Sequence, residues 1–156
     1  MSTVPSLISA IRDVLPTVDG VKRAYYPAPG QLQDSDLPAV VLYWGAPDGD
    51  TLITHESLND QMWVPVIRGD LMVAQLGETA KEFAQVDALL TPIVDAFAMD
   101  GEGISITDRD PAFGARIYQC QIERLRPTQQ ILYAGHSYYG AQIFWSCRLD
   151  RVTGSP

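Results

Sequence analysis

A regular alternation of apolar and polar residues near the end of the chain constrains the fold more than any other feature. Apolar side chains occupy every second position there, at Tyr139, Ala141, Ile143, Trp145, Cys147 and Leu149, and Phe144 is the one apolar residue between them. A period of two is typical of a β-strand that buries one face. We therefore predict a long strand in this region, with Ile143, Trp145 and Cys147 in the core.

An upstream segment with the same period supplies a partner for this strand. Apolar residues take alternate positions at Tyr118, Cys120 and Ile122, with polar residues between them. The polar stretch 127–137 separates the two segments and is able to turn the chain back. The sequence predicts one long antiparallel hairpin, with these three residues on its buried face.

Two other segments show the three- and four-residue spacing of an amphipathic helix. The first follows Thr3, a candidate N-cap, and its apolar stripe is Leu7, Ile8, Ile11, Val14 and Leu15. The second runs from about residue 75 to residue 99 and contains Pro92 near its end. That proline predicts either a kink in one helix or a second short helix capped by Thr91.

Shorter segments at 21–26, 37–44 and 62–67 are typical of strands, and 104–106 is a further candidate. Pro65 lies inside the third segment, which indicates a sheet edge or a bulge because proline cannot donate to the ladder. An edge strand carries unpaired backbone groups. Trp63 and Pro65 are therefore a candidate edge-strand interface.

The order of these elements predicts a single domain of the α+β class over residues 1–156, with a short flexible tail from about residue 153. We expect a mainly antiparallel sheet that includes the long C-terminal hairpin. The N-terminal helix and the long central helix should pack on one face of that sheet.

The polar segment 45–60 is either a loop or the tip of an extended hairpin. It is longer than the usual hairpin connection of about two to five residues. We expect residues 45–59 to project from the body of the protein. Its titratable residues are Asp48, Asp50, His55 and Glu56. The functional interpretation of these residues is that they form a negatively charged projection. The alternative is that they lie in a solvated turn without a function.

Charge and composition narrow the range of functions. The chain has 19 acidic and 11 basic residues, a net charge of −8, and no run of basic residues, which disfavours stable binding to nucleic acid. The acidic balance suits a surface past which DNA slides, although solubility alone also explains it. No segment approaches the ~20 apolar residues of a membrane span. Residues 1–5 have no basic region before an apolar run, so we expect no secretory signal. We expect a protein made in a cytoplasm.

The sequence offers no recognisable catalytic or metal-binding constellation. His55 and His136 lie in polar segments without neighbouring ligands, and no nucleophile elbow, phosphate-binding loop or dinucleotide fingerprint is present. Cys120 and Cys147 are too few for a disulfide framework, and we expect reduced core thiols rather than the alternative of a bridge across the hairpin. We expect no enzyme activity and no cofactor.

The order of elements also resembles that of a known family. A helix at 6–12 leads to Gly-Val-Lys at 20–22, and a loop leads to Leu-Pro-Ala-Val-Val-Leu at 37–42. A strand at 61–66 then precedes the long helix, and two long strands follow. This arrangement resembles the tail terminator proteins of long-tailed bacteriophages, also called tail completion or tail-to-head joining proteins. The resemblance covers most of the chain and lies in architecture rather than in a short motif.

The resemblance implies a structural virion protein assembled in the bacterial host cytoplasm. Tail terminators form a hexameric ring that caps the tail tube, stops its polymerisation and joins the tail to the head connector. DNA passes through the lumen of the ring without specific binding, and the projecting segment 45–59 would face a neighbouring subunit or this lumen. The alternatives are a head-side neck adaptor or head completion protein, a component of a contractile injection device, and a small enzyme or ligand-binding module.

Overall fold

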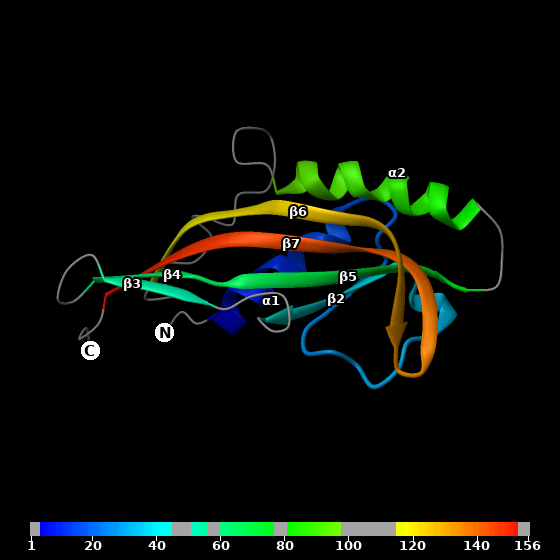
Figure 1. Cartoon of the computed structure of the whole chain (residues 1–156), viewed down its shortest axis with the longest axis horizontal. Helices are drawn as coiled ribbons and strands as arrows, with labels where there is room; N and C mark the ends of the chain where they lie inside the picture. Colours follow the sequence, from blue (N-terminus) through cyan, green and yellow to red (C-terminus); the bar gives the residue numbers. More distant parts are fainter. Residues whose placement is uncertain (1–3, 45–50, 56–59, 77–80, 98–114, 153–156) are drawn as a thin grey trace.

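The computed structural model describes residues 4–44, 51–55, 60–76, 81–97 and 115–152. Its helices are α1 (Val4–Val14) and α2 (Lys81–Ala96), with short 3₁₀ turns at Leu15–Thr17 and Asp34–Asp36. Its strands are β1 (Arg23–Tyr25), β2 (Ala39–Trp44), β3 (Leu52–His55), β4 (Asp60–Val64), β5 (Val66–Gln75), β6 (Ala115–Tyr133) and β7 (His136–Val152). All seven strands belong to one mostly antiparallel sheet (Figure 1).

Strand β7 is the centre of this sheet. On one side it pairs with β5 and, further along its length, with β4. On the other side it pairs with β6. Strand β2 lies beside β5, β1 runs parallel to β2, and β3 lies beside β4. The described edges of the sheet are therefore β1, β3 and β6.

The predicted C-terminal hairpin is confirmed, but its turn is much shorter than expected. Only Ala134 and Gly135 join the two strands, with φ values of 49° and 83°. Positive φ at both central residues matches the twist of a tight hairpin turn. Residues 127–133 continue β6, and Gln130 pairs with Tyr139. The polar side chains of this segment are compatible with a strand, because β6 lies at the sheet edge and pairs with β7 through its backbone.

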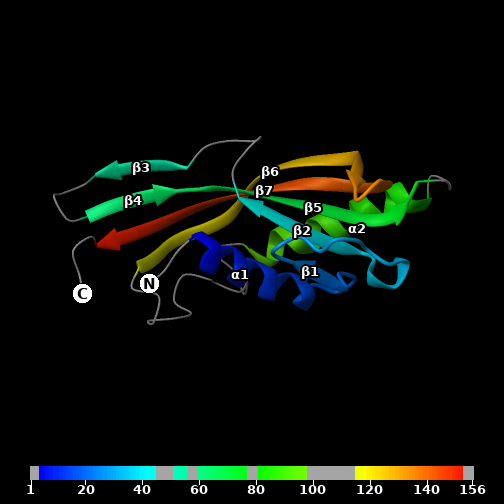
Figure 2. The same cartoon turned by 90° about the horizontal axis from the view of Figure 1, so that it is seen from below.

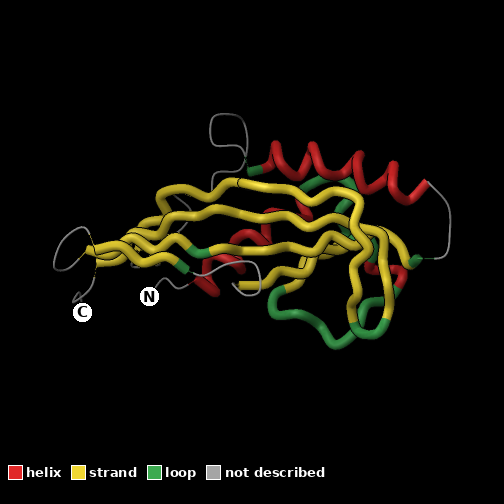
Figure 3. The backbone as a smooth tube through the Cα atoms, in the orientation of Figure 1, coloured by secondary structure: helices red, strands yellow, loops and turns green. Residues whose placement is uncertain are grey.

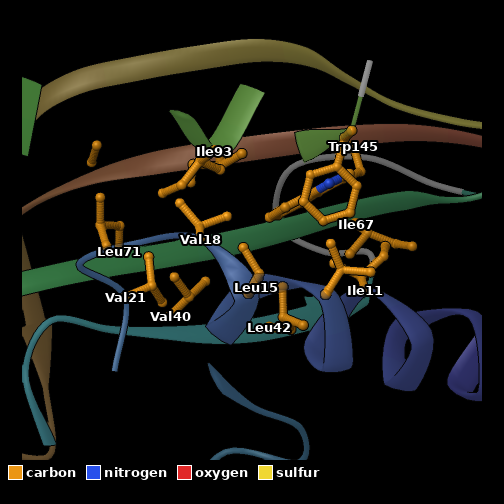
Figure 4. Packing of buried hydrophobic residues seen from close by; sticks show 14 of the residues in the cluster. Ile11, Leu15, Val18, Val21, Val40, Leu42, Ile67, Leu71, Ile93 and Trp145 are labelled. Atoms are coloured by element: carbon orange, nitrogen blue, oxygen red, sulfur yellow. The ribbon is translucent and has the colours of Figure 1, made fainter. Parts of the chain in front are cut away.

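Both helices cover one face of the sheet, where most of the core lies (Figure 4). The predicted stripe of the first helix is confirmed, since each of its members is at most 1% exposed: Leu7, Ile8, Ile11, Val14 and Leu15. Helix α2 contributes Val86, Leu90 and Ile93 to the same core. This helix-covered face is made by alternate residues of β2, β5 and β7, as the period of two predicts.

The predicted hairpin core is largely confirmed. Cys120, Ile143, Trp145 and Cys147 are buried, and Ile122 is half-buried against the same cluster. The side chain of Tyr118 lies outside the described residues. Phe144, which interrupts the alternation, is also buried, and it lies on the opposite face of the sheet from the helices.

The two cysteines are cross-strand neighbours on this core face. Cys120 pairs with Cys147, their Sγ atoms are 2.9 Å apart, and both thiols are free. Burial, and then the hydrogen bond to Cys120, raises the pKa of the Cys147 thiol. The raised pKa favours the neutral thiol of Cys147 over the reactive thiolate.

The prediction that Trp63 and Pro65 lie in an edge strand is wrong. Trp63 belongs to β4, which has β3 on one side and β7 on the other. Pro65 is buried and separates β4 from β5. A proline is tolerated at this interior position because it lies between two paired segments of the chain. Before Pro65 the outer neighbour is β3, and after Pro65 it is β2.

The long central helix is confirmed, but it begins later than predicted. Gln75 is the last residue of β5, and the described helix starts at Lys81. Residues 67–72 pair on both sides, and Ala74 and Gln75 still pair with β7, so the strand continues to the point where the helical spacing was predicted to begin. Pro92 lies inside α2, so the alternative of a second helix capped by Thr91 is wrong. The predicted strand at 104–106 lies outside the described residues.

Truncating Trp145 tests how far the fold depends on β7. The indole is fully buried, meets Phe97 edge-on with ring centroids 5.4 Å apart, and lies against Gly69. We expect Trp145→Ala to lower the free energy of unfolding by about 3–5 kcal/mol, measured by denaturant unfolding. Trp44→Ala is the control, because Trp44 is 42% exposed. Equal stability of the two variants would contradict the assignment of the core face.

Candidate interaction surfaces

The first candidate surface is the outer edge of β3. The β3–β4 hairpin extends past the ends of both helices, as Figure 2 shows. Leu52 and Ile53 on β3 are 59% and 41% exposed. Trp44, at the end of β2, donates its indole N–H to the Thr51 hydroxyl over 2.8 Å, which brings a third exposed apolar side chain to this edge. We call these three apolar side chains and the backbone of β3 the β3 edge.

The short β3 edge differs from the longer edge that β6 forms. Strand β6 has three register shifts against β7 and contains Pro127. Irregular pairing and proline both hinder the addition of another strand to an edge. Strand β3 pairs with β4 in one continuous register and contains no lysine, arginine or proline. Its geometry therefore suits pairing with a strand from another chain.

The structure resolves the choice between a loop and an extended hairpin for residues 45–60. The described part of this segment forms β3 and the start of β4, so the hairpin is the correct alternative. His55 is the exposed last residue of β3. Asp48, Asp50 and Glu56 lie outside the described residues.

The second candidate surface lies on the face of the sheet opposite the helices. Tyr43, Arg68, Phe144 and Arg124 are successive neighbours across β2, β5, β7 and β6. The Cζ atom of Arg68 lies 4.6 Å from the centroid of the Tyr43 ring, and that of Arg124 lies 4.2 Å from the Phe144 ring. Arg126 lies over the same Phe144 ring at 5.2 Å. These cation–π contacts orient the guanidinium groups. We call Arg68, Arg124 and Arg126 the arginine ladder.

A second row of polar contacts holds the ladder in place. The Arg68 Nε atom lies 3.2 Å from the Asp70 carboxylate. Gln142 donates to the same carboxylate over 3.4 Å, and Arg126 donates to the Gln142 side-chain oxygen, also over 3.4 Å. Asp70 is only 5% exposed, and a buried carboxylate requires partners of this kind. Asp70 offsets the charge of Arg68, and Arg124 and Arg126 form the outer, exposed part of the ladder.

A small apolar cluster closes the same face near the hairpin tip. Ile131, Tyr138 and Met72 pack there against the loop that precedes β2. Figure 3 shows this loop beside the tip of the β6–β7 hairpin. The Tyr133 hydroxyl donates to the Pro29 carbonyl oxygen and ties the tip to the loop. The arginine ladder thus lies between this cluster and the β3–β4 hairpin.

Sequence reasoning missed the arginine ladder entirely. The one local signal is the spacing of Arg124 and Arg126, because residues two apart on a strand share a face. Arg68 and Phe144 could not be joined to them without knowing the pairing of β5, β6 and β7. Sequence reasoning also missed the apolar side chains of the β3 edge, which lie within a segment that is otherwise polar.

Among the described residues, no three histidine, cysteine or acidic side chains are grouped so as to hold a metal ion. In the same part of the chain, no helix has the length and apolar character needed to cross a bilayer. A scan against protein-family models found no matching family, and a search of curated proteins found no match.

The environment of Tyr43 beside the ladder predicts a pH effect on stability. Burial, and then the charges of Asp70 and Tyr133, raises the pKa of Tyr43 from 10.0 to about 12. The unfolded chain then loses this phenol proton at a lower pH than the folded chain, so the free energy of unfolding should fall between pH 10 and about pH 12.

Denaturant unfolding at several pH values across that range measures the effect. Tyr43→Phe is the control, because it keeps the ring and removes the titrating group. We expect the fall in stability to be smaller in this variant. An identical fall in both proteins would contradict the assignment to Tyr43.

Proposed function

We propose that this protein is a structural virion subunit that assembles into a ring at the end of a bacteriophage tail tube. In this role the ring, a hexamer in the family it resembles, stops tube polymerisation and joins the tail to the head connector. The resemblance in the order of elements supports this proposal, since the chain follows the tail terminators from the first helix to the terminal strands. DNA would pass through the lumen without specific binding.

The β3 edge is the observation that carries the proposal. A closed ring forms by head-to-tail contacts, so each subunit must present two different complementary patches. An edge strand with an uninterrupted register supplies backbone donors and acceptors for a neighbour. Leu52, Ile53 and Trp44 add apolar area that assembly would remove from water.

Deletion of the gene tests the proposed function in infected cells. We expect filled heads and separate tails of unregulated length when the particles are viewed by electron microscopy. Heads that lose their DNA beside tails of normal length would instead support the head-side adaptor. Normal particles together with a missing metabolic activity would contradict both structural roles.

A point substitution tests whether the β3 edge, rather than another part of the surface, makes the assembly contact. Lysine on an edge strand hinders further strand pairing. We therefore expect Leu52→Lys to fail to complement the deletion while its unfolding free energy stays within about 0.5 kcal/mol of the parent. Leu132→Lys is the matched control, because Leu132 is 74% exposed at the hairpin tip, away from the β3 edge. Full complementation by Leu52→Lys would show that the β3 edge is not an assembly contact.

A further inference from the structure

We propose that the arginine ladder binds helix α2 of a second copy of this chain. The inference rests on the proposed function, because a ring requires two different patches on each subunit. The outer arginines of one subunit, Arg124 and Arg126, would face the carboxylates of Asp87 and Asp95 on the next. The contact defines which faces of neighbouring subunits meet, and the ladder alone does not set the number of subunits.

The ladder is built to receive carboxylates. Arg124 and Arg126 are exposed, yet both guanidinium groups are oriented over the buried ring of Phe144. The chain of contacts from Arg126 through Gln142 to Asp70 further limits their freedom. A planar guanidinium that is already oriented loses less entropy when it binds a carboxylate in the two-bond geometry that arginine favours.

The outer side of α2 has the complementary chemistry. Its exposed side chains between positions 84 and 95 are Ala84, Gln85, Asp87, Ala88, Thr91, Pro92 and Asp95. The only charges among them are the two carboxylates, which lie two turns apart and about 12 Å along the helix. Thr91 lies between them on the same stripe. The other exposed side chains are mostly small, so a flat sheet face is able to approach the helix closely.

The two patches lie on opposite sides of the same pair of strands. Helix α2 runs alongside β6 and β7 (Figure 1), and its buried residues pack into the core on the helix-covered face. Arg124 and Phe144 lie on the other face of those strands. A second copy stacked on the open face therefore brings its own α2 to the ladder. Each subunit then uses one patch on each side, which is a head-to-tail contact.

Charge complementarity favours a second copy over nucleic acid as the occupant. The chain has a net charge of −8, so a neighbouring copy approaches as an acidic partner. Tight binding to a phosphate backbone requires several clustered cations. Here the ladder has three arginines, and Arg68 lies beside the Asp70 carboxylate. The exposed arginines of the ladder and the exposed carboxylates of α2 are opposite in sign.

Two charge-reversed variants test this contact. Arg124→Glu/Arg126→Glu reverses the ladder, and Asp87→Arg/Asp95→Arg reverses the helix. In each variant the two patches carry the same sign, so we expect self-association, measured by sedimentation, to weaken by about tenfold or more. Mixed in equal amounts, the two variants restore opposite signs at every contact of an alternating assembly. We expect the mixture to associate as the parent protein does.

Matched controls separate this contact from a general effect of charge. Lys22→Glu and Asp19→Arg change exposed residues of the same signs, and we expect both to associate normally. Association of the parent should also weaken as salt is raised. Far-UV circular dichroism checks folding, and Arg124→Gln/Arg126→Gln replaces the reversed ladder if that variant does not fold.

The outcomes that overturn the inference are distinct from failure of the proposed function. The proposed contact would be contradicted if the parent chain remains monomeric. It would also be contradicted if the charge-reversed variants assemble like the parent. A mixture that does not recover would contradict it as well. Loss of binding to a DNA duplex, measured by anisotropy, without loss of self-association would assign the ladder to phosphate. In each case a normal gene-deletion phenotype for a tail terminator would leave the proposed function intact.

Discussion

The backbone hydrogen bonds that β7 makes with its neighbouring strands are the constraint on which the rest of the structure depends. This one strand pairs with β6 along one side and with β5 and β4 along the other. Both outer groups of strands attach to it through β4 and β5, and α2 covers β6 and β7. Trp145 fills the core at the middle of the strand. Because these pairings join distant parts of the sequence, the sheet forms only when β7 is in register.

Helices and strands whose apolar residues recur at a regular period on one buried face could be predicted from the sequence. The stripe of α1 and the alternation around Trp145 each reflect a single buried face. Prediction failed where hydrogen bonding between the backbones of neighbouring strands, rather than the pattern of side chains, determined the structure. The polar end of β6 pairs in a strand, and β5 continues to Gln75 because Ala74 and Gln75 still pair with β7. Pro65 suggested an edge, but it lies where one ladder ends and another begins.

The candidate surfaces were less predictable than the fold because they exist only after the strands have paired. Arg68, Phe144 and Arg124 come from three strands, and the sequence offers no local pattern that joins them. The segment 45–60 was expected to be either a loop or a hairpin, and its described part forms a hairpin, but no regular period in the sequence marks Leu52 and Ile53 as exposed apolar residues. A residue's chemistry can be taken from the sequence, whereas its neighbours across a sheet depend on the register.

In the proposed assembly, the distribution of charge over each subunit matters more than the net charge. Like-charged subunits repel one another at long range, but salt at physiological strength limits this repulsion to about 8 Å. Within that distance, the local arrangement of arginines and carboxylates dominates. A sheet that carries its arginine ladder on one side and an acidic helix on the other therefore presents opposite charges to neighbours on its two sides. Such a polarised subunit favours one orientation of its neighbours, and a constant orientation is what a closed ring requires.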